Sequence, residues 1–301
     1  MTTERNENDN VYREQDRGRP MQETLNSLPL NEAALLYAAT GWPVFPLAGK
    51  VPYEYLVPDV KSHGHKDATT DPAILHTWWS EHPKANIGLP TGAVSGVLVV
   101  DMDVPEGHYN LPKLQNSYAP LPQTRRARTA NGGLHYYFQY PQDGKRYPGA
   151  VGLAGLIGVD VRAEGNYVVL PPSRLIARKY YTWANPEQAI TPAPQWLLTL
   201  LTQAEEQRHI PQQGLGFASA SGEKWFAEAL DKAREGNRNT VGFWLARMLR
   251  NDGLPKEQTT RLLLLFANQV PQEHSPYTSH EALASVKSAY TRPAQERPRR
   301  I

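Results

Sequence analysis

The chain has 301 residues, of which 40% are hydrophobic, enough for one large or two moderate domains with an ordinary core. It contains no cysteine, which excludes disulfides and cysteine-ligated zinc sites and fits a cytoplasmic protein. The net charge of +2 selects no class of partner, and the absence of an apolar run of roughly 18 residues predicts no membrane span.

The N-terminal region is predicted to contain a flexible arm followed by two helices. Residues 1–27 are polar and lack the apolar core of a signal peptide, which favours a disordered arm. The segment 31–39 (NEAALLYAA) suits a helix with Asn31 as its N-cap. Asp71 followed by Pro72 predicts a second helix, because aspartate caps a first turn and proline fits its first position.

Residues 86–173 carry short apolar runs separated by Gly, Pro and Asn, the pattern of a β-sheet. The connections are short, so most neighbouring strands should be antiparallel. We therefore expect an α+β fold with a mixed, mostly antiparallel sheet, in a first domain over residues 28–203 that ends with a helix near 192–201. The expected strands are 87–89, 97–103, 135–139, 159–162 and 167–170.

The C-terminal third has the period of helices rather than strands. Residues 204–222 are rich in Gln, Ser and Gly, which is a linker composition. Beyond them apolar residues recur at helical spacing, and Thr278 with Glu281 matches a capping box. We expect a small all-α domain over residues 223–291 and a basic tail over 292–301.

Two aspartates form the most informative pattern. Asp101 and Asp103 follow the apolar run 96–100, which predicts a buried strand, and residues two apart on a strand share a face. A divalent cation between them would cancel their repulsion, and carboxylate oxygens suit Mg²⁺ or Mn²⁺. They are candidate metal ligands, and the alternative, two surface acids that open a turn, stays open.

A glycine pair and a histidine follow about thirty residues later, in the segment 131–135 (NGGLH). Gly132 and Gly133 allow a ligand to approach the backbone closely or the backbone to take positive φ. His135 begins an aromatic strand and is a candidate donor to a phosphate. The alternatives are a hairpin turn for the glycines and a structural hydrogen bond for the histidine.

A further acid and a cation share a strand face about twenty-five residues on. Asp160 and Arg162 are two apart in an apolar run. A carboxylate beside a guanidinium is most often a structural ion pair. Near a metal, the acid is instead a candidate third ligand and the arginine a candidate clamp on a triphosphate.

Basic clusters offer candidate contacts with nucleic acid. Arg125, Arg126 and Arg128 form one cluster, and the arginines of the tail 292–301 form another. Such clusters can hold phosphates, although most are solvated faces. We treat the first cluster as a candidate DNA-binding surface.

The order of these patterns resembles the three motifs of the archaeo-eukaryotic primase superfamily: strand acids, then Gly-Gly-x-His, then a strand Asp-x-Arg. More narrowly, the chain is similar to the bifunctional DNA primase–polymerase (prim-pol) domain of phages and plasmids, over about residues 32 to 200. Further resemblance lies in the segments 41–47, 66–72, 78–79, 86–88, 91–96 and 171–173.

The resemblance implies an RRM-like core that synthesises primers and polymerises DNA on a single-stranded DNA template, from dNTPs or NTPs. In the family the motif acids bind two divalent ions, Mg²⁺ or Mn²⁺, which carries over to Asp101, Asp103 and Asp160. The motif histidine contacts nucleotide phosphates, which carries over to His135. Further candidates for nucleotide or template contact are Ser173, Lys50 and Lys66, with Arg162 inferred as the triphosphate clamp.

The helical segment resembles the small C-terminal domain of many viral and plasmid primases, on residues 236–239, 244–247 and 285–290. Arg234, Arg238 and Arg247 would then bind single-stranded DNA or an initiating nucleotide. We expect no zinc, a separate replicative helicase as partner, and the cytoplasm of a bacterial or archaeal host as location.

Two other functions stay open. A catalytically idle replication-initiation or DNA-binding protein would keep the fold without the metal. A nuclease would use the same carboxylates but release nucleoside monophosphates. The residues also leave open the nucleotide preference, the template motif, the oligomeric state, and a phage, plasmid or defence role.

Overall fold

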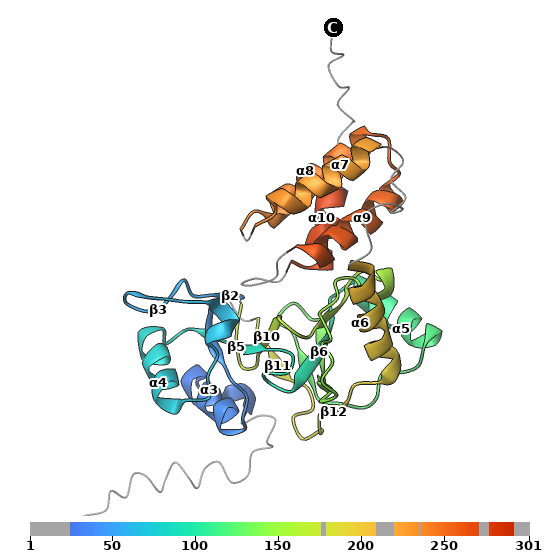
Figure 1. Ribbon diagram of the computed structural model, residues 1–301. Helices are drawn as coiled ribbons and strands as arrows, with labels where there is room; N and C mark the ends of the chain where they lie inside the picture. The colour runs from blue at the N-terminus through green and yellow to red at the C-terminus, as the bar shows by residue number, and fades with distance from the viewer. Residues whose placement is uncertain (1–24, 176–178, 209–219, 235, 271–276, 292–301) are drawn as a thin grey trace, which may run out of the picture.

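The computed structural model describes residues 25–175, 179–208, 220–234, 236–270 and 277–291, which form three packed parts (Figure 1). An N-terminal lobe and a central lobe each contain a β-sheet, and a helical part rests on the central lobe. The fold is α+β, as predicted. The paired strands are antiparallel except β12 and β8, which run parallel.

The N-terminal lobe is a four-stranded sheet of order β10-β5-β1-β2 with two helices. Helix α4 starts as predicted, because the Asp71 side chain accepts hydrogen bonds from the N–H groups of Ala73 and Ile74 and Pro72 opens the first turn. The elements are α3 (Leu30–Ala39), β1 (Phe45–Ala48), β2 (Val51–Pro52), α4 (Pro72–Glu81), β5 (Asn86–Pro90) and β10 (Tyr167–Leu170), with a hairpin of β3 (Tyr55–Val57) and β4 (Val60–Lys61) and a 3-10 turn η1 (Gly64–Asp67).

The central lobe contains the longer sheet, of order β11-β7-β8-β6-β9, with β12 added beside β8. Strand β6 lies between β8 and β9, so its side chains meet those of both neighbours. The elements are β6 (Val97–Met102), α5 (Glu106–Ser117), β7 (Arg126–Arg128), β8 (Leu134–Gln139), η2 (Leu153–Gly155), β9 (Val159–Arg162), β11 (Thr182–Trp183), β12 (Thr191–Pro192) and α6 (Gln195–Arg208).

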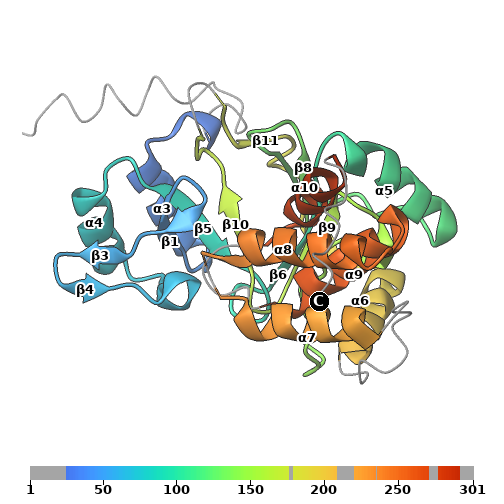
Figure 2. The same cartoon turned by 90° about the horizontal axis from the view of Figure 1, so that it is seen from above.

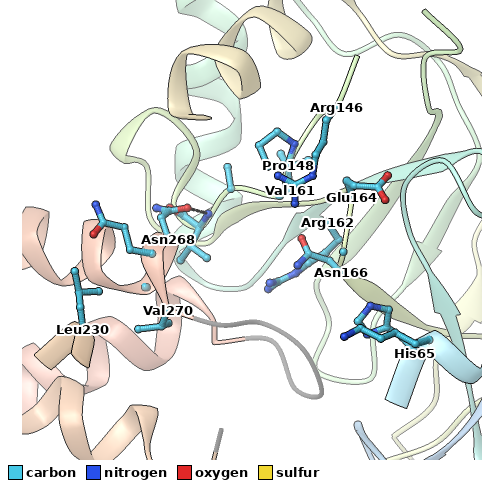
Figure 3. A pocket seen from close by; sticks show the side chains of 17 residues that line it. His65, Arg146, Pro148, Val161, Arg162, Glu164, Asn166, Leu230, Asn268 and Val270 are labelled. Atoms are coloured by element: carbon cyan, nitrogen blue, oxygen red, sulfur yellow. Dashed lines mark hydrogen bonds between the residues drawn. The ribbon is translucent and has the colours of Figure 1, made fainter. Parts of the chain in front are cut away.

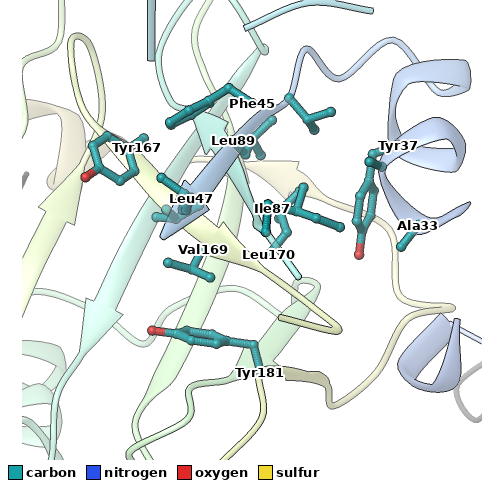
Figure 4. Packing of buried hydrophobic residues seen from close by; sticks show 14 of the residues in the cluster. Ala33, Tyr37, Phe45, Leu47, Ile87, Leu89, Tyr167, Val169, Leu170 and Tyr181 are labelled. Carbon is teal, nitrogen blue, oxygen red and sulfur yellow. The ribbon is translucent and has the colours of Figure 1, made fainter. Parts of the chain in front are cut away.

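Alternation along β6 divides the interior of the two lobes between two cores. Val97 and Val99 face the first core, which lies between the two sheets and is built largely from the N-terminal lobe (Figure 4). Leu98 and Val100 face the second core, on the side covered by α5 and α6. Asp101 follows the alternation of Val97 and Val99, so the strand points it toward the space between the lobes.

The helical part packs around a core of its own and is attached to the central lobe. Its helices are α7 (Ala220–Lys232), α8 (Arg238–Asn251), α9 (Lys256–Gln269) and α10 (Ser279–Tyr290). The predicted capping box is present at the start of α10. Val151 of the central lobe completes the helical core. Seen from above, the four helices lie over the central lobe and leave α3 and α4 uncovered (Figure 2).

The structure differs from the predicted boundaries in three places. Leu25 to Ser27 are helical, and Leu25 packs against the first core, so the predicted arm is too long at its end, while residues 1–24 lie outside the described part. Asn31 is not a cap, because α3 begins at Leu30 after Pro29. Helices α6 and α7 extend into both ends of the predicted linker. Among the described helices, none combines the length and apolarity needed to cross a bilayer.

Candidate active site

The strand register brings the predicted acids and cations together at one point of the central sheet. Asp101 of β6 lies opposite His135 of β8 on one side and Asp160 of β9 on the other. His135 Nε2 is 3.4 Å from Asp101 Oδ1, and an Arg162 guanidinium nitrogen is 3.7 Å from Asp101 Oδ2. Three neighbouring strands thus supply one cluster of opposite charges.

Asp160 and Arg162 form the buried side of this cluster. A guanidinium nitrogen of Arg162 lies 2.9 Å from Asp160 Oδ2, and both side chains are buried. The Gly152 N–H donates to Asp160 Oδ1 at 2.8 Å, so each carboxylate oxygen has a donor. Burial alone would lower the pKa of Arg162. The charges of Asp160 and Asp101 outweigh burial and hold that pKa above its usual range.

The two motif aspartates have opposite electrostatic environments. Burial would raise the pKa of Asp101, but the charges of His135 and Arg162 outweigh burial and lower that pKa to about 2. The charge of Asp101, with burial and the charge of Asp160, raises the pKa of Asp103 to about 7. Without a further cation, Asp101 therefore keeps its charge at neutral pH, and Asp103 holds its proton to a higher pH than an ordinary aspartate.

Asp101 and Asp103 line a cavity of about 370 Å³ between the two lobes, which we call the catalytic cavity. Strand β6 ends at Met102, yet both acids face the same space, as the spacing predicted. Lys50 also lines it, from the turn between β1 and β2, where the Tyr167 hydroxyl donates to the Lys50 carbonyl at 2.9 Å. An anion in this cavity would meet cations from both lobes.

Two of the three predicted metal ligands fit a divalent cation. Asp101 Oδ1 is buried, and its 3.4 Å approach to His135 is long for a hydrogen bond. The raised pKa of Asp103 reports the repulsion that a cation would relieve. Asp160 does not line the cavity, and no group of three or more acidic or histidine side chains within the described residues is arranged to hold a metal.

Comparison with known proteins identifies the family of this chain. The profile described as "Bifunctional DNA primase/polymerase, N-terminal" matches residues 34–196, more than half of the chain. The chain belongs to this family. Its membership assigns the chain a primase or polymerase role in DNA replication. The match contains every acid and cation of the cluster described above, and it ends before α7.

One solved structure, titled "Crystal structure of primase RepB'", aligns with 88% of this chain and 96% of its own, at 10% sequence identity and a TM-score of 0.31. No curated protein sequence matches the chain.

The predicted glycine and serine contacts have structural roles in this prim-pol domain. Gly132 takes a φ of +93° in the turn before β8, as the hairpin alternative expects. A Cβ on Gly133 would lie 2.3 Å from the Met102 carbonyl oxygen, so Gly133 permits close packing against β6. Ser173 is fully buried and accepts a hydrogen bond from the Ile87 N–H at 2.9 Å, which corrects its assignment to the nucleotide.

The predicted DNA-binding arginines do not line the catalytic cavity. Arg125 donates to the Gln188 carbonyl at 3.0 Å and lies over the Trp183 ring, and Arg126 lies over the Tyr136 ring. Arg128 is exposed at the end of β7. These three remain predictions for a surface outside the cavity.

The two predicted arginines of the helical part differ in exposure. Arg238 is only 4% exposed and does not line the catalytic cavity. Arg247 is half-buried on α8, with its guanidinium 5.9 Å from the centre of the Phe243 ring. Both contacts with DNA stay predictions.

Sequence reasoning missed several residues that line the catalytic cavity. Tyr181 is buried there, and burial together with Asp101 and Asp103 raises its pKa. His280 and Glu281 reach the cavity from the first turn of α10. The capping box located the start of α10, but no local pattern tells which surface a helix end will meet.

Proposed function

We propose that this protein makes primers on single-stranded DNA and extends them from nucleoside triphosphates by metal-dependent nucleotidyl transfer, in phage or plasmid replication. The observation that supports this most is the cluster of Asp101, His135 and Arg162 facing one cavity with Asp103. A nuclease would have less use for cations placed beside the acids, since triphosphate recognition needs them.

The residues divide into acids that would hold metal and cations that would meet phosphate. Asp101 and Asp103 are the proposed ligands of Mg²⁺ or Mn²⁺, which when bound lowers the pKa of the attacking hydroxyl and offsets charge on the phosphates. His135, Arg162 and Lys50 lie around the same space and would orient the triphosphate. Asp160, whose oxygens are already bonded, would hold the Arg162 fork in place.

The proposed reaction needs only the growing strand and the incoming nucleotide as reactants. The 3′ oxygen of the growing strand forms a bond to the α-phosphorus of the incoming nucleotide and gives up its proton to solvent. The bond from that phosphorus to the β-phosphate oxygen breaks, and pyrophosphate leaves. The cations supplied by this chain stabilise the charge that develops on the phosphate oxygens.

The test is synthesis on single-stranded DNA with labelled nucleotides and Mg²⁺ or Mn²⁺, with and without a supplied primer. Wild type should form oligonucleotides and release pyrophosphate, and the Asp101→Ala, Asp103→Ala variant should lose both activities. Asp231→Ala, an exposed acid on α7, is the matched control. Release of nucleoside monophosphates would identify a nuclease, and no product in either reaction would contradict an enzyme.

The Asp160→Asn variant in the same assay distinguishes two possible roles of Asp160, which are positioning Arg162 and binding the metal. An asparagine still accepts a hydrogen bond from Arg162 but is a poorer metal ligand. We expect the metal concentration for half-maximal extension to stay close to wild type in Asp160→Asn and to rise in Asp103→Asn. If the metal concentration for half-maximal extension rises equally in both variants, Asp160 is a metal ligand as well.

A further inference from the structure

Two stretches of the chain carry cations but no acid. Residues 107–142 and 165–186 contain no aspartate or glutamate, and their lysines and arginines are Lys113, Arg125, Arg126, Arg128, Arg174, Arg178 and Lys179. The first stretch supplies β7 and β8, the second supplies β11, and these three strands are neighbours in the central sheet. Folding therefore brings cations from both stretches to one edge of the sheet and creates a surface of a single charge sign.

The strand register gives part of this edge a common face. Arg128 of β7 pairs with Thr182 of β11 on one side and with Leu134 of β8 on the other. Arg126 pairs with Tyr136 of β8, and its guanidinium lies 6.0 Å from the centre of that ring. Directly paired residues point to the same side of a sheet, so these five residues form one surface, which we call the arginine face.

The arginine face is open to solvent at its edge. Arg128 is exposed, and the other four residues are half-buried. Strand β11 ends the strand order of the sheet and lies at the rim of the central lobe (Figure 2). Within the part of the chain that the structure describes, neither Arg126 nor Arg128 forms an ion pair with an acid. Their charges are therefore available to an anionic partner.

Tyr180 adds an exposed aromatic ring beside the arginine face. Tyr181 and Trp183 are buried, whereas Tyr180 is 46% exposed. Strand alternation places Tyr180 on the same side of the chain as Thr182 of the arginine face. The preceding residue, Lys179, is exposed and adds a further cation. Aromatic rings interleaved with cations are typical of surfaces that bind single strands, because the rings stack with bases while the cations meet phosphates.

The arginine face lies outside the catalytic cavity but borders it. None of its residues lines that cavity, or the cavity of about 580 Å³ between the helical part and the two lobes, where Figure 3 shows Arg146 and Arg162. Tyr181 lines the catalytic cavity, and its neighbour Thr182 belongs to the arginine face. Asn131, in the turn between β7 and β8, is exposed and also lines the catalytic cavity. A strand that leaves the catalytic cavity over this edge would therefore meet the arginine face next.

We propose that the arginine face and Tyr180 bind the single-stranded template outside the catalytic cavity, with phosphates on the cations and a base stacked on Tyr180. This proposal rests on the proposed function, because it takes the bound strand to be the template. An exposed ring favours a single strand over a duplex, whose bases are already stacked on one another. An acidic protein segment would match the cations but would leave the ring without a base to stack on.

The test is binding of labelled oligothymidylate to the full chain, measured by fluorescence anisotropy at several salt concentrations without nucleotide or divalent metal. Arg128→Ala, Lys179→Ala changes exposed side chains only and should raise the Kd by about tenfold at low salt. Because each phosphate contact contributes about 0.7 to the slope of log Kd against log salt, that slope should fall by about 1.4.

Tyr180→Ala should separate stacking from charge. Its Kd should also rise by about tenfold, but its salt slope should equal that of wild type, because stacking releases no counterions. In primer extension, both variants should need more template for half-maximal rate, while the rate at saturating template stays within about twofold of wild type.

Matched controls remove the same chemical groups elsewhere. Lys256→Ala, Arg261→Ala takes two charges from exposed positions on α9, and Tyr55→Ala removes a 49% exposed ring from β3. Neither control should change the Kd or the salt slope.

Three outcomes would overturn the proposal. Unchanged Kd values in the arginine-face and Tyr180 variants would show that DNA does not bind there. The same losses in the α9 control would mean that DNA responds only to total charge. Competition by polyglutamate as strong as by unlabelled DNA would assign the face to an acidic protein segment. Failure of wild type to extend a primer, with the binding losses as expected, would refute the proposed function but not the contact with single-stranded DNA.

Discussion

Asp101 shows how much of the site a single residue pattern can predict. The alternation of a strand was enough to place Asp101 and Asp103 at one cavity and to bring Asp160 and Arg162 to one face. Strand alternation could not predict that both Asp160 oxygens would accept hydrogen bonds, from Gly152 and Arg162, because those donors are brought there by tertiary contacts. The grouping of these residues was therefore readable from the sequence, whereas the partners of Asp160 were not.

At the scale of single residues, we predict that Asp103→Asn stabilises the metal-free protein above neutral pH. Folding raises the pKa of Asp103 from 3.8 to about 7, so the folded state binds this proton more tightly than the unfolded state. The resulting stabilisation is complete below pH 4 and is lost as pH rises through about 7. The melting temperature of the variant should exceed that of wild type by a few degrees at pH 7.5 and by much less at pH 4.5.

The measurement is thermal unfolding in chelator across this pH range. Asp231→Asn, exposed on α7, is the control and should show no such trend. Adding Mg²⁺ at pH 7.5 should stabilise wild type and reduce its difference from Asp103→Asn. A difference that is the same at both pH values would contradict the raised pKa.

At the scale of elements, helix starts were predicted where a local pattern defines them, as at Asp71 and Thr278. How the helices dock was not predictable, because docking depends on single side chains with no periodic signature. Asn268 of α9 is an example: its side chain accepts from the Val151 N–H at 2.7 Å and donates to the Val151 carbonyl at 2.9 Å. Ser279 of α10 accepts from the Gly158 N–H at 3.2 Å.

We predict that Asn268→Ala lowers the free energy of unfolding by about 1–3 kcal/mol, because the buried Val151 backbone groups lose their partners. Chemical denaturation with tryptophan fluorescence measures the change. Gln258→Ala removes an exposed amide from the first turn of the same helix and should cost far less. Equal effects would mean that the Asn268 bonds contribute nothing beyond helix propensity.

At the scale of the whole molecule, the α+β class and the order of the parts followed from the change of period along the chain. How these parts assemble did not follow from the sequence, because no local pattern predicts that a helical part will line a cavity between two sheets. Thr278, His280 and Glu281 line the catalytic cavity, and the Ser279 N–H is 3.5 Å from Asp160 Oδ2. Residues of all three parts thus line the catalytic cavity.

Removing residues 220–301 should therefore reduce primer extension by at least about tenfold as well as initiation. The two sheet cores contain no residue from this segment, so the remaining chain should keep its strands, as circular dichroism would report. Primer extension at the wild-type rate by the truncated protein would show that the helical part is dispensable for the chemistry.

The shared position of Arg162 has a thermodynamic consequence. Arg162 lines the catalytic cavity and also the cavity of about 580 Å³ between the helical part and the two lobes, and its guanidinium holds two acids. A ligand that draws on its donors in one cavity therefore alters what Arg162 offers in the other. Linkage makes that influence reciprocal: the factor by which the first ligand changes the affinity of the second equals the factor in the opposite direction. Any pair of ligands that occupies the two cavities should therefore show coupled affinities, with Arg162 as the side chain common to both.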